Sequence, residues 1–408
     1  MRLELKHPTK KVRAQLTITG SKSETNRLLL LQALYPNLII ENQSNSDDSL
    51  AMHKALHSQE KTRDIHHAGT AMRFLTAFFA TKENSDIILT GSHRMQERPI
   101  ALLVDALNAL GGNITYDKEK GFPPLKIIGK QLEGGEVTLP ANISSQYISA
   151  LLLIAPKLTS GLRLHLEGEI TSLPYIKMTL ALLERLGIKT SFEGKTIEIP
   201  FHATIEKQTQ VVESDWSSAS YWISTLSLVE EGEIHLSNYR EDSLQGDAVL
   251  RKIYRQLGVE SDFEGNTLIL KKNTNFVLPE KIELDLVEAP DIAQTIAVSC
   301  YGLGVACNLT GLHTLKIKET DRLLALEKEL SKLGAIITVD DKSLQLAATQ
   351  NFQRNQSIDT YHDHRMAMAF APLGLKIPLH INDAGVVSKS YPSFWKDMKS
   401  TGFQVIEK

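Results

Sequence analysis

The sequence has only two cysteines and no long apolar run. Cys300 and Cys307 fall in or just after an apolar stretch, so we expect buried thiols and no disulfide framework. No segment approaches the roughly 18 apolar residues that a membrane-spanning helix needs. Residues 1–13 are charged and lack the apolar core of a signal peptide. These absences predict a cytoplasmic protein.

A charge excess of either sign is also missing. The 408 residues include 45 Lys and Arg and 48 Asp and Glu, which is a formal net charge of −3. This balance excludes the broad basic field of a nucleic-acid-binding protein, so we expect neither nucleic acid nor a membrane as a partner. With 42% hydrophobic residues, the chain is long and apolar enough for at least two domains, each with its own core.

Basic residues instead occur where helices are predicted to begin. Residues 318–322 precede an apolar helix face that runs to Leu333, with Thr320 as the expected N-cap and Arg322 in the first turn. A cation there opposes the helix dipole, whereas a bound phosphate or carboxylate would reverse the effect. For this segment alone, a surface ion pair is the alternative.

Similar polar or basic helix starts are predicted at six other places. Each one alone is compatible with an ordinary capped helix. Together they predict helix N-termini that converge on a polyanionic ligand, because unpaired backbone N–H groups bind anions. The starts are Ser23 or Thr25, with Lys22 and Arg27; Thr70, with Arg73; Ser144-Ser145-Gln146; Ser217-Ser218; Asp291, as the cap of residues 292–298; and Asp363-His364-Arg365.

The chain is organised as an internal repeat. A Leu-Gly pair ends a predicted helix at Gly111, Gly187, Gly258 and Gly334, every 71–76 residues, and predicted strands follow each pair. Glycine is a natural C′ residue, and turns such as Glu193-Gly194-Lys195 are hairpin signals. This period suits an α/β subdomain that is used several times.

Further motifs are spread over residues 20–389, nearly the whole chain. They are Gly20-Ser21-Lys22-Ser23 through Asn26-Arg27, Ala68-Gly69-Thr70-Ala71-Met72-Arg73, Arg94-Met95-Gln96-Glu97-Arg98-Pro99-Ile100, Ser144-Ser145-Gln146, Ser172-Leu173-Pro174-Tyr175, Pro290-Asp291, residues 318–322, Asp363-His364-Arg365-Met366-Ala367-Met368 and Lys389. In content and order, this set resembles the motifs of the 5-enolpyruvylshikimate-3-phosphate synthases.

The resemblance implies a fold. It is of the α/β (α+β) class, a two-domain inside-out α/β barrel in which each domain has three βαβαββ repeats around a pseudo-threefold axis. Residues 20–214 would form the shikimate-3-phosphate-binding domain. Residues 1–19 and 215–408 would form a discontinuous second domain, with the active site in the interdomain cleft.

The resemblance also implies an activity. The enolpyruvyl (1-carboxyvinyl) group of phosphoenolpyruvate would be transferred to the 5-hydroxyl of shikimate-3-phosphate, with release of phosphate, in the shikimate pathway to chorismate and the aromatic amino acids. It implies no metal, no organic cofactor, these two small molecules as the only partners, and a monomer. Both substrates carry a phosphate and a carboxylate, so their site needs many cations and helix dipoles.

Individual roles follow from the same resemblance. Lys22, Arg98, Arg322, Arg365 and Lys389 would surround phosphoenolpyruvate, with Gly69 allowing close backbone approach. Ser23, Arg27, Ser144, Ser145, Ser172, Tyr175 and Lys318 would hold shikimate-3-phosphate, with Gln146 between the substrates and Asp291 and His364 completing the binding set. In catalysis, Glu319 would protonate the methylene carbon, Asp291 would deprotonate the hydroxyl, and Lys22 would assist proton transfer and stabilise the departing phosphate.

Three positions depart from the family pattern. His67 and Thr314 stand where the family often has Asn, and Phe74 stands where it often has Pro. They leave open the shape of the phosphoenolpyruvate site, its sensitivity to glyphosate and one contact to shikimate-3-phosphate. An ordinary exposed loop imidazole is the alternative for His67.

Three other functions are weighed against this one. Enolpyruvyl transfer to UDP-N-acetylglucosamine shares the fold, but that family uses a loop cysteine, and no cysteine of this sequence is predicted in such a loop. A metal hydrolase would use His66-His67 and His362-Asp363-His364, whose spacing lacks an i+4 partner or a Cys cluster. A non-catalytic phosphosugar-binding module would lack Asp291 or Glu319, and both are present.

Overall fold

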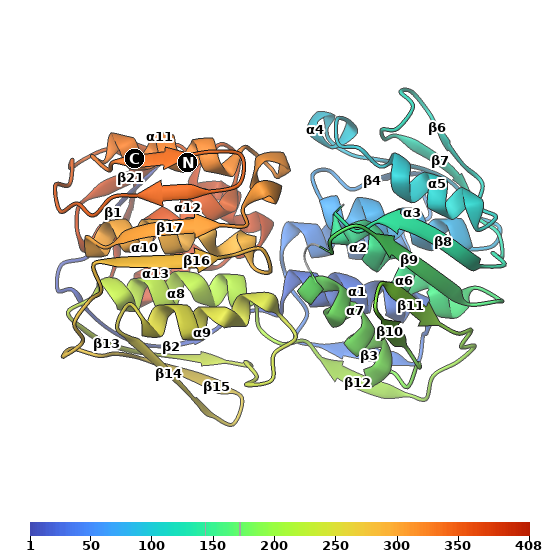
Figure 1. The fold of residues 1–408 in the computed structure, drawn as a ribbon, viewed down its shortest axis with the longest axis horizontal. Coiled ribbons are helices and arrows are strands. Elements are labelled where there is room, and N and C mark those ends of the chain that lie inside the picture. Colours follow the sequence, from blue (N-terminus) through green and yellow to red (C-terminus); the bar gives the residue numbers. More distant parts are fainter. Residues whose placement is uncertain (143, 171–172) are drawn as a thin grey trace. The chain divides into compact units, whose positions relative to one another are not determined.

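The computed structural model of the chain describes residues 1–142, 144–170 and 173–408. These residues form two compact units: unit 1 comprises Met1–Thr19 and Glu213–Lys408, and unit 2 comprises Gly20–Val212 (Figure 1). The chain therefore leaves unit 1 after Thr19 and returns to it after Val212, where the sequence-based division placed the return after residue 214. Within the described ranges, no helix is long and apolar enough to cross a membrane.

Unit 1 contains three four-stranded sheets that share one topology. In each sheet, the first two strands are parallel, and the second and third strands both pair antiparallel with the fourth. The repeats are β2 (Lys11–Thr17), α8 (Trp216–Leu228), β13 (Glu231–Ser237), α9 (Leu250–Arg255), β14 (Val259–Glu264) and β15 (Thr267–Lys272); β16 (Lys281–Asp285), α10 (Ala293–Leu303), β17 (Ala306–Thr310), α11 (Arg322–Lys332), β18 (Ile337–Val339) and β19 (Leu344–Leu346); and β20 (Ser357–Ile358), α12 (His364–Phe370), β21 (Leu379–Ile381), α13 (Phe394–Ser400), β22 (Gln404–Glu407) and β1 (Leu3–Lys6).

Unit 2 repeats this topology twice in full. Its third copy is reduced to two helices and one pair of parallel strands. The elements are β4 (Thr62–Asp64), α3 (Gly69–Thr81), β5 (Asp86–Thr90), the short α4 (His93–Gln96), α5 (Ala101–Ala109), β6 (Ile114–Tyr116) and β7 (Leu125–Ile128); β8 (Gly135–Pro140), α6 (Ser145–Ile154), β9 (Leu162–Glu167), α7 (Leu173–Arg185), β10 (Ser191–Glu193) and β11 (Thr196–Ile199); and α1 (Lys22–Leu34), β3 (Leu38–Glu41), α2 (Asp47–His57) and β12 (Gln208–Val211).

The predicted repeat is confirmed at the glycines that end its helices. Gly111, Gly187, Gly258 and Gly334 all have φ between 77° and 99°, the left-handed region that only glycine adopts without strain. The turns at Gly194 and Gly265 also have positive φ and join the two strands of a hairpin. The α/β class and the βαβαββ unit were therefore correctly predicted.

The first helix of each repeat belongs to the core of its unit. Helices α8, α10 and α12 pack against one another in unit 1, as do α1, α3 and α6 in unit 2. All but one residue of α8 is buried, which is the pattern of a helix surrounded by protein. Its buried hydroxyls bond to backbone carbonyls, as in Thr225 Oγ1 to Tyr221 O (2.8 Å). Because the three first helices of each unit lie together, residues at their N-termini can meet within that unit.

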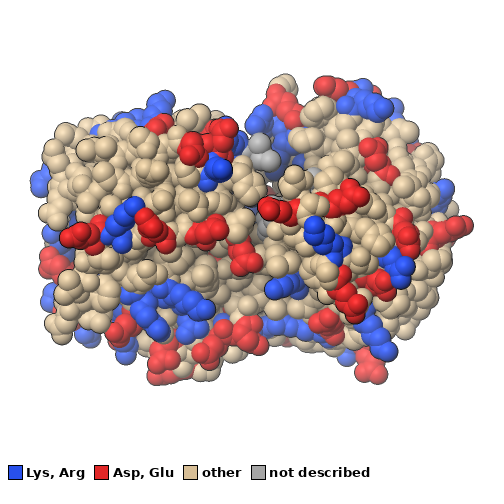
Figure 2. Space-filling model, viewed as in Figure 1, with Lys and Arg blue, Asp and Glu red and all other residues tan. Residues whose placement is uncertain are grey.

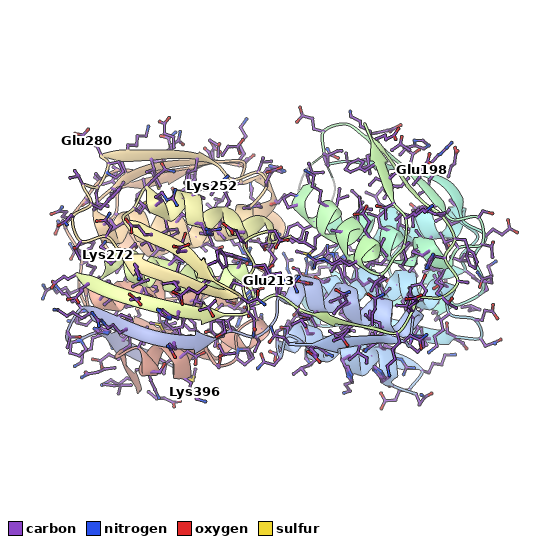
Figure 3. The ribbon with its side chains drawn as sticks, turned by 90° about the horizontal axis from the view of Figure 1, so that it is seen from below. Glu198, Glu213, Lys252, Lys272, Glu280 and Lys396 are labelled. Carbon is purple, nitrogen blue, oxygen red and sulfur yellow. The ribbon has the colours of Figure 1, made fainter. Side chains whose placement is uncertain are left out.

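The return of the chain to unit 1 is fixed by a buried carboxylate. Glu213, which is labelled in Figure 3, is 2% exposed and accepts hydrogen bonds from Trp216 Nε1 (2.7 Å), Ser243 Oγ (2.6 Å) and the backbone N–H of Arg240 (3.0 Å). Burial raises the pKa of Glu213, and these donors act in the opposite direction.

On the face of the molecule seen in Figure 2, acidic and basic side chains alternate over both units. Neither sign forms a continuous field there among the described residues, as the balanced composition predicts.

Candidate active site

In unit 1, one arginine binds three carboxylates. Arg322 donates from Nε to Asp363 Oδ2 (2.6 Å), from Nη1 to Asp291 Oδ1 (2.8 Å) and from Nη2 to Glu319 Oε2 (2.8 Å). Its side chain is only 2% exposed. Burial alone would lower the pKa of Arg322, but Asp363, Glu319 and Asp291 outweigh that effect and raise the pKa above its ordinary value. The guanidinium is therefore a fixed, permanent cation.

A second arginine reaches the same carboxylate from another helix. Arg365, in the first turn of α12, donates from Nη1 to the backbone carbonyl of Asp291 (3.1 Å) and from Nη2 to its Oδ2 (3.3 Å). Asp291, Glu319, Arg322, Asp363 and Arg365 are called the unit 1 cluster below. It joins the starts of α10, α11 and α12, so these predicted helix N-termini do converge.

Three predicted helix caps were wrong. Helix α1 is capped by Ser21, and the expected caps Ser23 and Thr25 lie within the helix. Asp291 was expected to cap a helix, but it lies in the 3-10 turn Pro290–Ile292, and α10 has no side-chain cap. Its carboxylate faces the two arginines instead, because charge-assisted bonds outweigh a cap. The cap of α11 is Asp321, which accepts from the backbone of Leu323 and Leu324, and not Thr320.

Arg365 also binds a hydroxyl group that is paired with a buried acid. Its Nη2 donates to Ser217 Oγ (3.2 Å), and Ser217 in turn donates to Asp247 Oδ2. Asp247 is 7% exposed and lies in the 3-10 turn Gly246–Val249. Ser217 was predicted only as part of a helix start. Asp247 belongs to none of the motifs described above, so it was not predicted as a site residue.

Burial raises the pKa of Asp247 to about 6, although Arg365 acts in the opposite direction. Since this folded-state pKa lies above the ordinary 3.8, the contribution of Asp247 to stability is full below pH 3.8 and is lost as the pH rises through about 6.

Asp247→Asn removes the charge and keeps an acceptor for Ser217. Its stability relative to the parent is expected to increase by about 1 kcal/mol between pH 5 and pH 7.5, measured by urea unfolding. A difference that does not change with pH would contradict this.

Lys318 and Lys389, both predicted site residues, lie at the edge of the same unit. Lys318 Nζ is 3.4 Å from Asp291 Oδ1. Lys389 ends the 3-10 helix Ala384–Lys389 and donates to the backbone carbonyl of His362 (2.7 Å). Tyr361 and His362 both have positive φ, 53° and 56°, which is a strained conformation of the kind found near functional sites. Lys389 is thus tied to the strained segment that leads into the cluster.

The histidines of the metal-site alternative are arranged differently from that expectation. His364 is buried at the start of α12, whereas His362 is exposed and bonds to Asp383. Asp363, between them, is bound by Arg322. In the described part of the chain, no group of three or more His, Cys, Asp or Glu side chains could hold a metal ion.

In unit 2, a buried arginine has neutral partners. Arg27 of α1 is 2% exposed and donates to Thr179 Oγ1 (2.8 Å), Ser149 Oγ (2.9 Å) and the backbone carbonyls of Ser23 (2.8 Å) and Tyr175 (3.3 Å). Burial lowers the pKa of Arg27 to about 10. None of its hydrogen-bond partners within the described ranges is a carboxylate, so a bound anion would stabilise this cation.

Two aromatic rings line Arg27. Its Cζ lies 5.4 Å from the ring centre of Phe74 and 5.8 Å from that of Tyr175, within cation–π range. Phe74 therefore has a specific contact at the position where the family often has Pro. Tyr175 contacts Arg27 through both its ring and its carbonyl.

A glycine and an arginine lie in close contact at the start of α3. A Cβ built on Gly69 would lie 2.6 Å from Arg98 Nη1. Arg73 fixes both segments, because it donates to the backbone carbonyls of Gly69 (3.2 Å) and Pro99 (3.1 Å). It is 4% exposed, and burial lowers its pKa to about 10, with a further contribution from Arg98. Arg73 was predicted only as a first-turn cation; its position between the two segments was not.

The start of α6 meets the start of α3. Ser144 caps α6, and Gln146 Nε2 donates to Thr70 Oγ1 (3.1 Å). Ser145 is buried in the first turn. Ser172, which was also predicted to bind shikimate-3-phosphate, lies outside the described residues.

Lys22 shares a carboxylate with the histidine that departs from the family pattern. Its Nζ is 3.5 Å from Asp48 Oδ2, and His67 Nε2 is 3.7 Å from Asp48 Oδ1. His67 is therefore more than an exposed loop imidazole. Asp48, in the first turn of α2, was not predicted as a site residue.

The third position that departs from the family pattern, Thr314, lies in unit 1. Its buried hydroxyl has no hydrogen-bond partner in the described structure.

Comparison with known proteins gives one consistent result. The family model described as EPSP synthase (3-phosphoshikimate 1-carboxyvinyltransferase) matches residues 53–398. The 3-phosphoshikimate 1-carboxyvinyltransferase of Bacteroides fragilis is 43% identical over 415 residues, covering 99% of both chains, and that of Pseudoalteromonas translucida is 36% identical over 430 residues, covering 98% of this chain and 99% of its own. The solved EPSP synthase of Acinetobacter baumannii has a TM-score of 0.81 at 21% identity, with full coverage of both chains, which supports the same fold.

Proposed function

The chain belongs to the EPSP synthase (3-phosphoshikimate 1-carboxyvinyltransferase) family, and from this premise we propose how its residues carry the reaction. The enzyme transfers the enolpyruvyl group of phosphoenolpyruvate to the 5-hydroxyl of shikimate-3-phosphate and releases phosphate, a step of aromatic amino acid biosynthesis. Its fold is the two-domain inside-out α/β barrel. Transfer to UDP-N-acetylglucosamine is not favoured, because the matching family and relatives all carry the shikimate name.

We propose that the unit 1 cluster performs the proton transfers. Asp291 takes the proton of the 5-hydroxyl as its oxygen attacks C2 of phosphoenolpyruvate, and Glu319 gives a proton to C3. This forms a tetrahedral intermediate that carries both the phosphate and the new C–O bond. Loss of phosphate, with transfer of one proton from the methyl group back to Glu319, then gives the enol ether. Arg322 holds both carboxylates through two separate N–H groups, which fixes their spacing.

We propose that phosphoenolpyruvate is bound by cations from both units. Arg365 and Arg322 come from helix starts in unit 1, and Arg98 lies beside Gly69 in unit 2. Arginine suits this role because it binds carboxylate and phosphate in a bidentate way. Lys389 and Lys22 complete the set, and Lys22 stabilises the phosphate as it leaves. Two observations, one in each unit, support the proposal: Arg322 and Arg365 both bind Asp291 in unit 1, and Arg98 lies beside Gly69 at the start of α3 in unit 2.

Shikimate-3-phosphate is proposed to bind mainly in unit 2. Arg27 is buried among hydroxyls without a carboxylate among its hydrogen-bond partners in the described structure, so the phosphosugar's phosphate is its natural counter-ion. The remaining proposed contacts are Ser23, Ser144, Ser145, Gln146, Ser172 and Tyr175 from unit 2, and Lys318, Asp291 and His364 from unit 1.

Arg27→Ala is expected to weaken shikimate-3-phosphate binding by about 10²-fold, because a charge-assisted bond to a buried guanidinium is lost. The kcat at saturating substrate should change far less. Calorimetry gives the first quantity and steady-state kinetics the second. Arg185→Ala, which removes a part-exposed arginine 3.9 Å from Glu24, is the matched control and should leave both unchanged. Equal loss of affinity for both substrates would contradict the assignment.

Gly69→Ala is expected to raise the KM for phosphoenolpyruvate about tenfold and to leave that for shikimate-3-phosphate within twofold. The added Cβ would lie 2.6 Å from Arg98 Nη1, so the guanidinium has to move. The second substrate serves as the internal control. A proportional rise in both KM values would show that the substitution disturbs α3 as a whole.

The function itself is tested by phosphate release. Purified protein should release phosphate only when phosphoenolpyruvate and shikimate-3-phosphate are both present, and a chelator should not reduce the rate. Release with UDP-N-acetylglucosamine as the acceptor would favour the sister reaction. A monomeric state and a cytoplasmic location are proposed as well, and sedimentation velocity and cell fractionation test them.

A further inference from the structure

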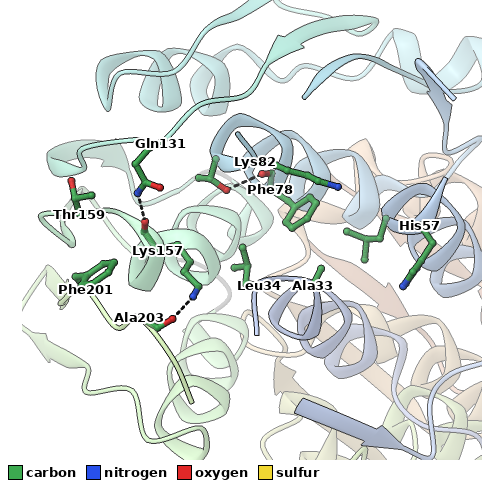
Figure 4. Close-up of a pocket in the computed structure, with 12 residues that line it drawn as sticks. Ala33, Leu34, His57, Phe78, Lys82, Gln131, Lys157, Thr159, Phe201 and Ala203 are labelled. Atoms are coloured by element: carbon green, nitrogen blue, oxygen red, sulfur yellow. Dashed lines mark hydrogen bonds between the residues drawn. The ribbon is translucent and has the colours of Figure 1, made fainter. Parts of the chain in front are cut away.

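Unit 2 has a pocket at the opposite end of its central helices from the proposed substrate contacts. Its volume is about 610 Å³, within the usual range for small-molecule sites. Helices α1 and α3 carry Lys22 and Gly69 at their N-terminal ends and border the pocket with Leu34 and Thr81 at their C-terminal ends. Within unit 2, the pocket is therefore separate from the proposed substrate contacts at the N-terminal ends of these helices. Figure 4 shows the pocket with the residues that line it.

The floor of the pocket is apolar and partly aromatic. Leu34, Leu56 and Phe78 come from the ends of three helices, and Phe201 adds a second ring. Phe201 is 48% exposed, which leaves a large aromatic face uncovered beside the pocket. Such a surface favours a flat apolar group, since aromatic rings stack on one another.

The charged side chains that line the pocket are all basic. Lys82 and Lys157 line it together with His57, and no acidic side chain does. Lys157 Nζ donates to Ala203 O (2.5 Å) and lies 3.9 Å from the ring centre of Tyr35, and Lys82 Nζ lies 5.8 Å from the ring centre of Phe78. Neither lysine forms an ion pair in the part of the chain that the structure describes.

Lys157 has N–H donors that its one hydrogen bond does not use. An ammonium group has three N–H donors, and Lys157 gives one of them to Ala203, so two remain. Burial lowers the pKa of Lys157, and an anion would reverse that effect. Figure 4 shows Lys157 and Lys82 reaching the pocket from different sides, with Phe78 between them. A ligand with one anionic group can thus pair with Lys157 while its ring lies against Leu34 and the exposed ring of Phe201.

We propose that this pocket binds a small aromatic carboxylate, with its carboxylate on Lys157 and its ring against Leu34 and Phe201. The apolar floor selects the ring, and the lysine selects the negative charge.

The test uses a fluorescent probe, naphthalene-2-carboxylate, and its neutral analogue naphthalene-2-carboxamide. The full-length parent protein should bind the carboxylate at least about tenfold more tightly than the amide, since only the former gains a charge-assisted bond. Lys157→Met keeps the apolar stem and should remove that preference. Lys130→Met, at an exposed lysine that does not line the pocket, is the matched control and should keep it.

A second arm separates this pocket from the substrate site. Saturating shikimate-3-phosphate should not displace the probe, and Arg27→Ala should bind it as the parent does. Equal affinity for carboxylate and amide, an unchanged preference in Lys157→Met, or displacement by shikimate-3-phosphate would each overturn the proposal. These outcomes do not depend on whether the protein turns over its substrates.

Discussion

Glu319→Gln is expected to lower kcat by about 10²–10⁴-fold, the usual contribution of a positioned general acid. The affinity for shikimate-3-phosphate should stay within about threefold of the parent's. Glutamine has the shape of glutamate and can still accept the hydrogen bond from Arg322 Nη2, which is 2.8 Å from Oε2 in the parent. What it cannot do is give a proton to the methylene carbon of phosphoenolpyruvate.

Two measurements check this prediction. Steady-state kinetics gives kcat, and calorimetry with shikimate-3-phosphate gives the affinity. Glu327→Gln, in α11 and not part of the unit 1 cluster, is the matched control and should behave as the parent does. An unchanged kcat, or a loss of affinity as large as the loss of kcat, would show that Glu319 is not the acid.

Arg322→Lys is expected to lower the free energy of unfolding by about 2–4 kcal/mol and to lower kcat/KM for phosphoenolpyruvate by at least about 10²-fold. Lysine keeps the charge but cannot donate in three fixed directions to Asp291, Glu319 and Asp363 as the guanidinium does. At least one carboxylate is then left without its cation. This is costly because the site is buried: the Arg322 side chain of the parent is only 2% exposed. The geometry of both proton-transfer groups is lost at the same time.

Urea unfolding and steady-state kinetics measure these two effects. Arg255→Lys, at an exposed arginine of the same unit, is the matched control and should change neither. If Arg322→Lys does not fold, Asp363→Asn tests the same cluster, because it removes one charge yet keeps the cap of α12. Its unfolding free energy should fall by about 1–3 kcal/mol. Full stability in both variants would contradict the account of the cluster.

Local sequence signals predicted the repeat well. A glycine after a helix leaves a clear trace, because the left-handed conformation at Gly111, Gly187, Gly258 and Gly334 selects that residue type. The start of α6 at Ser144 was also predicted, since a serine cap precedes an apolar run. Both signals lie within a few residues of the feature that they predict.

The partners within the clusters could not be predicted in this way. Arg365 and Asp291 are 74 residues apart in sequence, and Arg27 and Thr179 are 152 apart. No spacing rule connects such pairs; they meet because α10 packs against α12 in unit 1 and α1 packs against α7 in unit 2. Asp291 was taken for a helix cap for the same reason, since an acid before a helix looks the same whether it caps that helix or binds arginines from two others.

Phosphorus NMR of one turnover tests the central assignment most directly. With enzyme in excess over phosphoenolpyruvate and shikimate-3-phosphate, the parent should convert the phosphoenolpyruvate signal into inorganic phosphate and shift the sugar phosphate signal to that of the product. Glu319→Gln should show shikimate-3-phosphate in its bound form with no new phosphate over the same time. Phosphate release by Glu319→Gln at the parent's rate would contradict the assignment of proton transfer to the unit 1 cluster.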